Sequence, residues 1–420
     1  MRKSIVSIGV FLVSILSLNA VCLPQAHGAA GNSMDNAYRH VPISELASIV
    51  KFAGCTLDGL LNSYSGIETG SNEITGRLTL FDNYVDLLSR SHCIYVNRAV
   101  ETWDTPPDFS AIEANMTALL RHSRRSYVFG VFVAESVSLT KTYYYPDESR
   151  NFNFREMCES TPEPAASHCI ASFEQAEYQK YVAYIAQKSI DLGFQVFLFG
   201  AAGLTDSKST ATTSGLLKVV HKIKSYAAKN NVSTLFIAQD PSTFGGRAYI
   251  DSFDLVQGGA YIDADGSLPN AVIVTNKGSG SAHAPPRLWL VKDPEGKPFY
   301  DPQRLVFEYD WFGDPADDSS EVACLSVKSP TYLNTVRGVS PGNCPEGHVV
   351  GSALPAMQKA YDFFKGMGAG FWLPGRQPIA FPPWVYTPLN LDLYKRDSRF
   401  EVNFNDEGIL SIPAMKEYAR

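Results

Sequence analysis

Short apolar runs, of the kind that parallel sheets bury on both faces, recur along this chain and alternate with helical patterns from about residue 49 to 375. Eight of these runs are rich in β-branched and aromatic residues. We predict them as strands over Ile49–Cys55, Cys93–Val100, Tyr127–Ala134, Phe194–Gly200, Thr234–Ala238, Phe253–Gln257, Leu305–Tyr309 and Gly370–Leu373. Repeated alternation of strand and helix indicates an α/β fold with a parallel sheet. Eight strands favour closure into a (β/α)8 TIM barrel, and an open doubly wound sheet is the alternative.

Apolar side chains at helical spacing separate most of these runs. The stripes are Phe81, Tyr84, Val85 and Leu88; Ile112, Met116, Leu119 and Leu120; Tyr178, Val182 and Ile185; Leu216, Val219, Val220 and Ile223; Leu354, Met357, Tyr361 and Phe364. Ser172 and Gln175 have the spacing of a capping box before the third stripe, and Gly193 is placed to end that helix.

The segments that follow predicted strands are much longer than those that follow predicted helices. Residues 137–171 follow the third strand, 258–304 the sixth and 312–351 the seventh. Barrel enzymes build their sites from the loops after strands, so the elaboration lies at the face where chemistry would occur. The alternative is that these loops are tolerated insertions without a role.

The N-terminus has the order of a secretory signal: Arg2 and Lys3, an apolar stretch from Ile5 to Val21, and small residues after it. We predict cleavage after Gly28, with cleavage after Ala20 or Ala30 and an uncleaved membrane anchor as alternatives. The mature chain would then be secreted or periplasmic, with no membrane span. The expected organisation is a signal peptide over 1–28, an extension over 29–44, the barrel over 45–380 and a tail packed on it over 381–420.

Six cysteines remain after the predicted cleavage, and an even number in an exported chain indicates disulfides. Sequence alone leaves their connectivity open. Closure over short distances favours pairs Cys158–Cys169 and Cys324–Cys344, each in one long loop, and Cys55–Cys93 remains by exclusion. The absence of a CxxC pair disfavours a metal cluster.

Several function classes are disfavoured by missing motifs. The net charge of −7 and the lack of a basic run disfavour a nucleic-acid partner. No HExxH or P-loop motif is present, which disfavours the usual zinc hydrolases and nucleotide binding. The glycines from Gly366 to Gly370 precede a strand instead of following one, which is the wrong order for a dinucleotide. We therefore expect no cofactor and no metal.

Acidic residues at the ends of predicted strands are the remaining candidates for chemistry. Glu135 follows the third strand, Asp240 the fifth and Asp310 the seventh, where Glu308 also lies. A buried carboxyl stays protonated while a solvated one ionises, and glycoside hydrolysis needs such a pair. We assign Glu135 as general acid, Asp310 as base or nucleophile, and Asp240 as stabiliser or replacement for either. The structural alternative is that such acids cap helices, most of all Asp240 before Pro241.

Aromatic, amide and charged residues near the same strand ends complete a predicted sugar site. Flat rings pack on sugar C–H faces, while amides and acids bind hydroxyl groups. The predicted substrate-binding residues are Glu101, Trp103, Gln239, Gln257, Tyr261, Trp311, Trp372 and Arg376.

The chain resembles exported TIM-barrel proteins of the glycoside-hydrolase type over about residues 45–376. The likeness is carried by Ala134-Glu135, Gln239-Asp240, the run from Leu255 to Gly259, Tyr309-Asp310-Trp311 and Gly370-Phe371-Trp372. It implies acid/base hydrolysis of a glycosidic bond in a polysaccharide or cell-surface glycan, and a role in carbohydrate metabolism. One departure is that the fourth strand ends Phe199-Gly200-Ala201-Ala202 without the acid that many retaining barrel glycosidases place there.

Two other functions stay open. The first is a non-catalytic glycan-binding or surface protein on the same barrel, which the missing acid on the fourth strand favours. The second is another exported enzyme, such as a polysaccharide lyase or a phosphodiesterase. Barrels of this kind host many chemistries, so the fold does not separate these functions.

Overall fold

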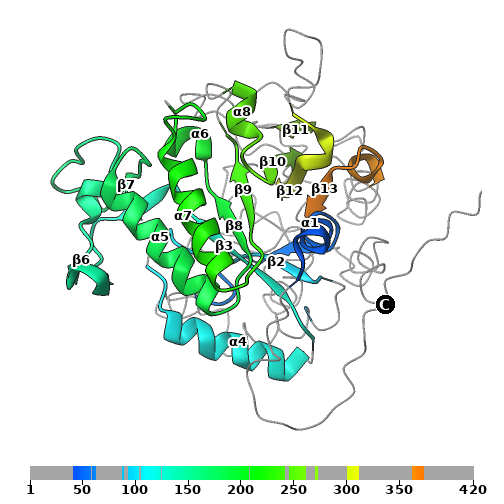
Figure 1. Cartoon of the computed structure of the whole chain (residues 1–420), viewed down its shortest axis with the longest axis horizontal. Coiled ribbons are helices and arrows are strands. Elements are labelled where there is room, and N and C mark those ends of the chain that lie inside the picture. Colours follow the sequence, from blue (N-terminus) through cyan, green and yellow to red (C-terminus); the bar gives the residue numbers. More distant parts are fainter. Residues whose placement is uncertain are drawn as a thin grey trace, which may run out of the picture.

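The structure is a computed structural model that describes residues 41–57, 59–62, 88, 93–103, 106–123, 125–207, 209–241, 246–261, 270–272, 300–311 and 362–372. These ranges hold the strands of a curved parallel sheet and the helices that cover its outer face (Figure 1). The predicted signal peptide, extension and C-terminal tail, together with Cys324, Cys344 and Arg376, lie outside the described residues.

Eight parallel strands follow one another around the sheet in the order in which they occur along the chain. They are β1 (Gly54–Thr56), β2 (Tyr95–Glu101), β3 (Val128–Val133), β8 (Val196–Phe199), β9 (Leu235–Gln239), β10 (Leu255–Tyr261), β12 (Leu305–Trp311) and β13 (Gly370–Trp372). A short strand, β11 (Asn270–Val272), pairs antiparallel with β10. A doubly wound sheet would reverse strand order at its centre, and this sheet does not. The predicted (β/α)8 barrel is confirmed.

The first and last strands meet through their side chains, so that the barrel is nearly closed. The ring of Trp372 on β13 lies 5.5 Å from that of Tyr95 on β2, and a side chain at Gly54 on β1 would collide with the indole. Glycine on the intervening strand is what lets these two large rings approach each other. Trp372 and Tyr95 are both fully buried.

The first predicted strand is partly wrong, because residues up to Phe52 form helix α1 (Ile43–Phe52) and the strand begins at Gly54. An apolar run this short does not distinguish a buried helix from a buried strand, and Leu46, Ile49 and Val50 are also spaced for a helix. These three side chains are buried in one cluster with the inward-facing residues of the strands. Helix α1 thus closes the barrel at the N-terminal ends of its strands.

Hydrogen bonds hold this closure in place. The Gln195 side chain, just before β8, accepts a bond from Val41 N at 3.0 Å and donates to Val41 O at 2.9 Å. On the far side of the helix, Trp372 Nε1 donates to Val50 O at 2.5 Å. Backbone atoms of Lys51 lie within 3.0 Å of the position that a side chain at Gly370 would occupy.

Three long helices cover the described outer face: α4 (Phe109–Ser123), α5 (Ala176–Asp191) and α7 (Gly215–Lys229). The predicted stripes face the sheet, since all but Leu120 of their members on these helices are buried. Shorter helical turns are α6 (Ala202–Thr205), α8 (Gly246–Ile250) and η6 (Pro302–Arg304). Gly193 has φ 89° just after α5, as predicted.

The predicted capping box before α5 is wrong. The helix begins only at Ala176, and its N-cap Gln175 makes no side-chain capping bond. Ser172 Oγ instead accepts from Glu174 N at 3.2 Å, inside the preceding turn. By contrast, Ser214 does cap α7, accepting a bond from Leu217 N at 2.9 Å.

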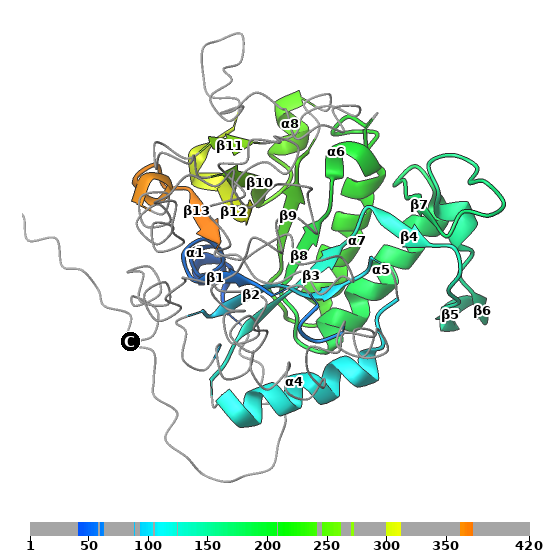
Figure 2. The same ribbon diagram turned by 180° about the vertical axis from the view of Figure 1, so that it is seen from behind.

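The long segment after β3 forms a lobe that projects from the barrel (Figure 2), and we call residues 136–171 the disulfide lobe. Two small antiparallel ladders build it: β4 (Ser136–Ser138) with β7 (His168–Ile170), and β5 (Tyr144–Tyr145) with β6 (Arg150–Asn151). The short helices η2 (Pro146–Glu148) and η3 (Phe154–Met157) complete it. Disulfides Cys158–Cys169 in this lobe and Cys55–Cys93 beside β1 confirm two of the predicted pairs.

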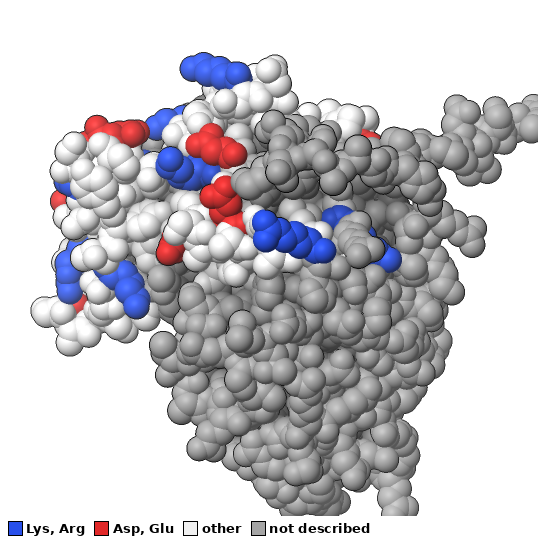
Figure 3. Space-filling view, turned by 90° about the horizontal axis from the view of Figure 1, so that it is seen from below, with Lys and Arg blue, Asp and Glu red and all other residues white. Residues whose placement is uncertain are grey.

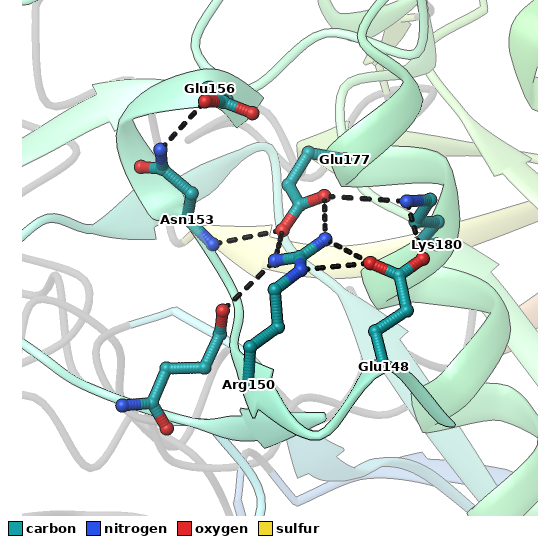
Figure 4. Close-up of polar contacts among 7 residues, drawn as sticks. Glu148, Arg150, Asn153, Glu156, Glu177 and Lys180 are labelled. Carbon is teal, nitrogen blue, oxygen red and sulfur yellow. Dashed lines mark hydrogen bonds and ion pairs between the residues drawn. The ribbon is translucent and has the colours of Figure 1, made fainter. Parts of the chain in front are cut away.

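Ion pairs fasten the disulfide lobe to helix α5 (Figure 4). Arg150 binds Glu177 through two hydrogen bonds of 2.5 and 2.8 Å, and Glu177 also accepts from Asn153 N at 2.9 Å. Lys180 Nζ lies 2.6 Å from Glu148 Oε1. The hydrogen bond from Arg150 lowers the pKa of the Glu177 carboxyl, so this carboxylate is charged over the neutral range.

The described surface carries charges of both signs. Figure 3, which views the molecule from below, shows acidic and basic side chains side by side on the described part of that face. Large apolar side chains are exposed at Ile43, Tyr144 and Ile170, of which the last two belong to the disulfide lobe. Among the helices in the described ranges, none has the length and apolar character needed to cross a membrane.

Candidate active site

The barrel interior changes from apolar to polar toward the C-terminal ends of the strands. Leu255 and Val306 belong to the inward-facing apolar cluster, and Gln257 and Glu308 lie two residues further along the same strands. Residues two apart share a face of a strand, so both side chains enter the barrel. They are buried, and Gln257 Nε2 donates to Glu308 Oε2 at 2.9 Å.

A second buried polar group lies across the barrel on β1 and β2. Tyr95 OH donates to Asn97 Oδ1 at 2.8 Å, and Asn97 Nδ2 donates to Thr56 Oγ1 at 3.1 Å. Burial, and to a lesser degree the Glu308 carboxylate, raises the pKa of Tyr95, so its hydroxyl remains protonated. Both groups are buried inside the barrel, one on β10 and β12 and the other on β1 and β2.

Glu135 lies at the end of β3, where the chain leaves the sheet for the disulfide lobe. Its Oε2 atom is buried and has no hydrogen-bond partner among the described residues. A side chain added at Gly200 would lie 2.8 Å from this oxygen and 2.6 Å from Phe132 Cζ. The carboxyl of Glu135 therefore fills the space above the end of β8, the strand that has no acid of its own.

Burial is the main cause that raises the pKa of Glu135 above its usual range. A hydrogen bond from the backbone N–H of Glu135 lowers this pKa, and smaller effects come from Arg98, which lowers it, and Glu101, which raises it. Behind Glu135, the buried Tyr178 hydroxyl donates to Ala134 O at 2.9 Å and fixes the backbone at the end of β3. A carboxyl that holds its proton at higher pH than usual is what a general acid requires.

Strained backbone is concentrated at this end of the barrel. Of five described non-glycine residues with positive φ, three lie within or just after barrel strands: Arg98 in β2 at 55°, Ala201 after β8 at 37° and Asp240 after β9 at 45°. Strain of this kind persists where the surrounding structure enforces it, and it clusters at functional sites. Gly203 N donates to Asp240 O at 3.0 Å, so the loops after β8 and β9 support each other.

The structure brings several predicted site residues to the strand ends. Glu101 is buried, whereas Trp103, Gln239 and Asp240 are partly exposed. The Trp103 ring lies 5.9 Å from that of Phe132, and Gln239 Oε1 accepts from Ala201 N at 3.3 Å. Helix α8 is described from Gly246, and residues 242–245, where a helix capped by Asp240 would begin, lie outside the described residues.

Trp372 is placed away from the mouth of the barrel. It is fully buried and bonded to Val50 O, so its rings belong to the barrel core and offer no exposed face to a sugar. Tyr261, Asp310 and Trp311 lie on the backbones of β10 and β12, and the structure does not describe their side chains. The role predicted for Arg376 falls outside the described residues.

Three buried polar atoms at this end of the barrel have no hydrogen-bond partner among the described residues: Trp103 Nε1, Glu135 Oε2 and Gln257 Oε1. Leaving such an atom unpaired is unfavourable by about 1–3 kcal/mol, and native proteins usually avoid it. Trp103 Nε1 presents a donor, Gln257 Oε1 an acceptor, and the Glu135 carboxyl donates when protonated and accepts when ionised. This pattern suits a ligand with several hydroxyl groups, because each hydroxyl both donates and accepts.

Two residues of the site received no role from the sequence, although both carried a signal. Arg98 and Glu308 are charged residues inside otherwise buried strands, and a charge in such a strand needs a partner. Arg98 Nε binds Glu101 Oε1 at 2.6 Å, and Glu308 binds Gln257. Within the described residues, no group of three or more His, Cys, Asp or Glu side chains is arranged to hold a metal ion.

No protein-family model matches the chain, and no curated protein matches it. Among solved structures, it is similar to a GH27 β-L-arabinopyranosidase from Geobacillus stearothermophilus, with 8% identity, a TM-score of 0.30, and 51% of this chain and 54% of that one covered. It is also similar to the Bacillus licheniformis trehalose-6-phosphate hydrolase, with 7% identity, a TM-score of 0.31, and 49% of this chain and 48% of that one covered. A third similar structure is histamine dehydrogenase from Rhizobium sp. 4-9, with 12% identity, a TM-score of 0.27, and 42% of this chain and 32% of that one covered. The chain spans about half the length of these proteins or less, and TM-scores this low assign neither a family nor an activity.

Proposed function

We propose that this protein is a glycoside hydrolase that acts on a polysaccharide or cell-surface glycan, with Glu135 as the general acid. The single observation that carries the proposal is the Oε2 atom of Glu135, which lies buried and without a hydrogen-bond partner among the described residues, above Gly200 at the C-terminal end of the barrel. Burial keeps this carboxyl protonated at a pH where an exposed one has lost its proton. It is therefore able to protonate a leaving group.

The position of Glu135 accounts for the missing acid on the fourth strand. Its carboxyl occupies the space that a side chain at Gly200 would need, so the acid reaches the end of β8 from the neighbouring strand β3. In the proposed step, Glu135 gives its proton to the glycosidic oxygen as the bond from that oxygen to the anomeric carbon breaks. The second carboxylate attacks that carbon, or activates a water that does so.

Asp310 is the proposed second carboxylate, and Asp240 its alternative. Asp310 follows Glu308 by two residues on β12, nearer to the C-terminal end of the strand. Asp240 follows β9 on a strained backbone. A carboxylate separation of about 5–5.5 Å would give retention at the anomeric carbon, and about 6.5–9.5 Å would give inversion.

The remaining unpaired atoms support a sugar as the ligand. The Trp103 indole N–H would donate to one hydroxyl or ring oxygen, and Gln257 Oε1 would accept from another hydroxyl. Gln257 is held by its bond to Glu308, so its carbonyl group is fixed in direction. Fixed polar groups in a concave site are what gives sugar recognition its specificity.

The test is to incubate the purified protein with a panel of polysaccharides and to measure new reducing ends. Glu135→Gln should lower the rate by about 10²–10⁴-fold on the substrate that is cleaved, because the acid is lost while the shape remains. Asp310→Asn should cause a similar loss. Glu174→Gln, at an exposed carboxyl before α5, is the matched control and should leave the rate unchanged. Cleavage at an unchanged rate in both site variants would support glycosidase activity but contradict the assignment of Glu135 and Asp310 as its catalytic residues.

A non-catalytic glycan-binding protein is the second candidate. The absence of an acid on β8 favours it, as does the engagement of the Glu308 carboxylate by Gln257. In that case, the same panel would give binding to one glycan, measured by calorimetry, with no new reducing ends. Glu135→Gln would then change the affinity only modestly.

We also propose that the chain is exported and that its first 28 residues are removed. The two disulfides support this proposal, since disulfides persist in oxidising compartments. N-terminal sequencing of protein recovered outside the cytoplasm should find Ala29 as the first residue. A mature protein that keeps residues 1–28 would contradict it.

A further inference from the structure

A bulge in β2 places a charged pair beside the proposed acid. Between Val96 and Val100 the strand advances by four residues, while its neighbour β3 advances only from Phe129 to Val131. Arg98 lies within this bulge with φ 55°. The loop after β1 supports the bulge, because Gly59 N donates to Arg98 O at 2.8 Å. Bulges next to active sites commonly re-aim a side chain, and here the Arg98 side chain is buried.

The Arg98 guanidinium is held on both sides. Its Nε donates to Glu101 Oε1 at 2.6 Å, with side chains that are 6% and 4% exposed. Its Cζ lies 4.2 Å from the centre of the Phe132 ring. Glu101 is itself fixed by Asn62, which donates to Glu101 O at 2.6 Å and accepts from Glu101 N at 3.0 Å.

Phe132 connects this pair to Glu135. The edge of its ring and Glu135 Oε2 both lie within 2.8 Å of the position that a side chain at Gly200 would occupy. The guanidinium packs over the same ring. The proposed acid and the Arg98–Glu101 pair are thus neighbours inside one buried cluster, where water screens charges weakly.

The groups around Glu135 can be named element by element. Strand β2 contributes Arg98 and Glu101, which act on Glu135 in opposite directions. Helix α5 contributes Tyr178, whose pKa burial raises so far that its hydroxyl stays neutral. Phe132 on β3 and Gly200 after β8 carry no charge. Arg98 and Glu101 are therefore the charged side chains, among the described residues, that act on this carboxyl.

We propose that Arg98 and Glu101 are positioning residues that together set the protonation of Glu135: Glu101 neutralises the Arg98 guanidinium, so that the cation orients the cluster without drawing the proton from the acid. This inference rests on the proposed function for its meaning in catalysis. It gives Glu101 a positioning role in place of the predicted substrate-binding role, because its carboxylate is buried and bound to Arg98. It also explains why a buried ion pair, which stabilises proteins little, is built on strained backbone.

The experiment titrates Glu135 directly in the full-length mature protein. Carbon-13 NMR of protein labelled at glutamate carboxyls follows its ionisation, and the Glu135 signal is the one missing from Glu135→Gln. Glu101→Gln should shift the Glu135 titration to lower pH, since the guanidinium is no longer neutralised. Arg98→Met should shift it to higher pH, and the double variant should titrate between the two.

Folding of each variant is checked by circular dichroism. Should Glu101→Gln alone fail to fold, the double variant compared with Arg98→Met isolates the same charge, because those two proteins differ only at residue 101. The inference is overturned if Glu135 titrates at the same pH in the wild type and the variants, or if the two single variants shift it in the same direction.

Activity separates this inference from the proposed function. If the protein cleaves a glycan, the basic limb of kcat/KM against pH should move with the NMR titration in each variant. Opposite NMR shifts in a protein that cleaves nothing would leave the inference about the pair standing and remove the proposed hydrolysis. Cleavage with a pH profile that is the same in the wild type and in both variants would support the proposed hydrolysis and remove the inference about the pair.

Discussion

At the scale of single residues, Glu135 owes its properties to its neighbours more than to its own type. A glutamate at the end of a strand is ordinary, but here Gly200 leaves room for its carboxyl and the edge of the Phe132 ring lies at the same place. The result is a carboxyl with a raised pKa and an unpaired buried oxygen. The ionised form of such a group is unfavourable in the folded protein, and this has a measurable effect on stability.

Because the pKa of Glu135 is raised on folding, its contribution to stability is fully present below the unfolded value of about 4.3 and is lost as the pH rises through the folded value. Glu135→Gln removes this ionisation. We therefore expect the melting temperature of the variant to gain on that of the wild type as the pH rises through this window, and the difference to stay constant above it. Calorimetric scans at a series of pH values measure this. A difference in melting temperature that stays constant over the whole pH range would show that folding does not raise the pKa of Glu135.

Sequence reasoning reached Glu135 because strand ends can be read from apolar runs and turn residues. It assigned no role to Arg98, because a bulge adds residues to a strand without leaving a mark in the apolar pattern. It placed Trp372 at the mouth because the residue ends a strand, whereas the indole turns back to Val50, a partner more than 300 residues earlier. Contacts at such separation are not visible in local patterns.

At the scale of elements, helix α1 closes the floor of the barrel through one face only. Leu46 on that face is fully buried, while Ile43 on the same helix is 48% exposed. Leu46→Ala should lower the free energy of unfolding by about 2–5 kcal/mol, since it leaves a cavity in the floor. Ile43→Ala is the matched control and should change it by about 0.5 kcal/mol or less. Denaturant titration of both variants checks this, and equal effects would contradict the closure by α1.

The disulfide lobe depends on Arg150 for its attachment to α5. This side chain is 37% exposed, so its bonds to Glu177 contribute modestly, and Arg150→Met should make local opening of the disulfide lobe easier. Hydrogen exchange across Tyr144–Met157 should become faster, with the barrel strands unchanged. The control is Arg155→Met, in an exposed arginine that donates only to Pro164 O at 3.1 Å within the same lobe. Similar exchange in both variants would mean that other contacts hold the lobe.

At the scale of the whole molecule, the two described disulfides act on different units. Cys55–Cys93 joins β1 to the start of β2 and closes a segment of 38 residues, whereas Cys158–Cys169 closes 11 residues inside the lobe. Losing the first should destabilise the barrel by about 4 kcal/mol, by the entropy of the longer loop. Losing the second should loosen the lobe and leave the barrel transition nearly unchanged.

Paired serine variants of each disulfide test this difference. Calorimetry should show a lower barrel transition for Cys55→Ser with Cys93→Ser. Limited proteolysis should show faster cleavage within residues 136–171 for Cys158→Ser with Cys169→Ser. An equal loss in the barrel transition for both would mean that lobe and barrel unfold as one unit.

The architecture was predictable from sequence to the extent that each strand and helix carries its own pattern. The number and order of the strands, the stripes on α4, α5 and α7, and two disulfides follow from spacing within short segments. The helix α1 was missed because its apolar run merges into β1, and the tie between Arg150 and Glu177 was missed because it joins distant segments. Sequence patterns within short segments predict single helices and strands, whereas the candidate site is formed by contacts between several of them.

The floor of the barrel has a consequence for how the chain reaches this structure. Helix α1 precedes every strand of the barrel, yet the bond to Val50 and the close approach to Lys51 come from β13, the last strand. A chain that emerges from its N-terminus makes α1 first but can complete the contacts of this helix only after β13 has arrived. Contacts this distant in sequence slow folding. The helix is therefore formed first but fully packed last. Until it packs, the apolar interior of the barrel is exposed at the N-terminal ends of its strands.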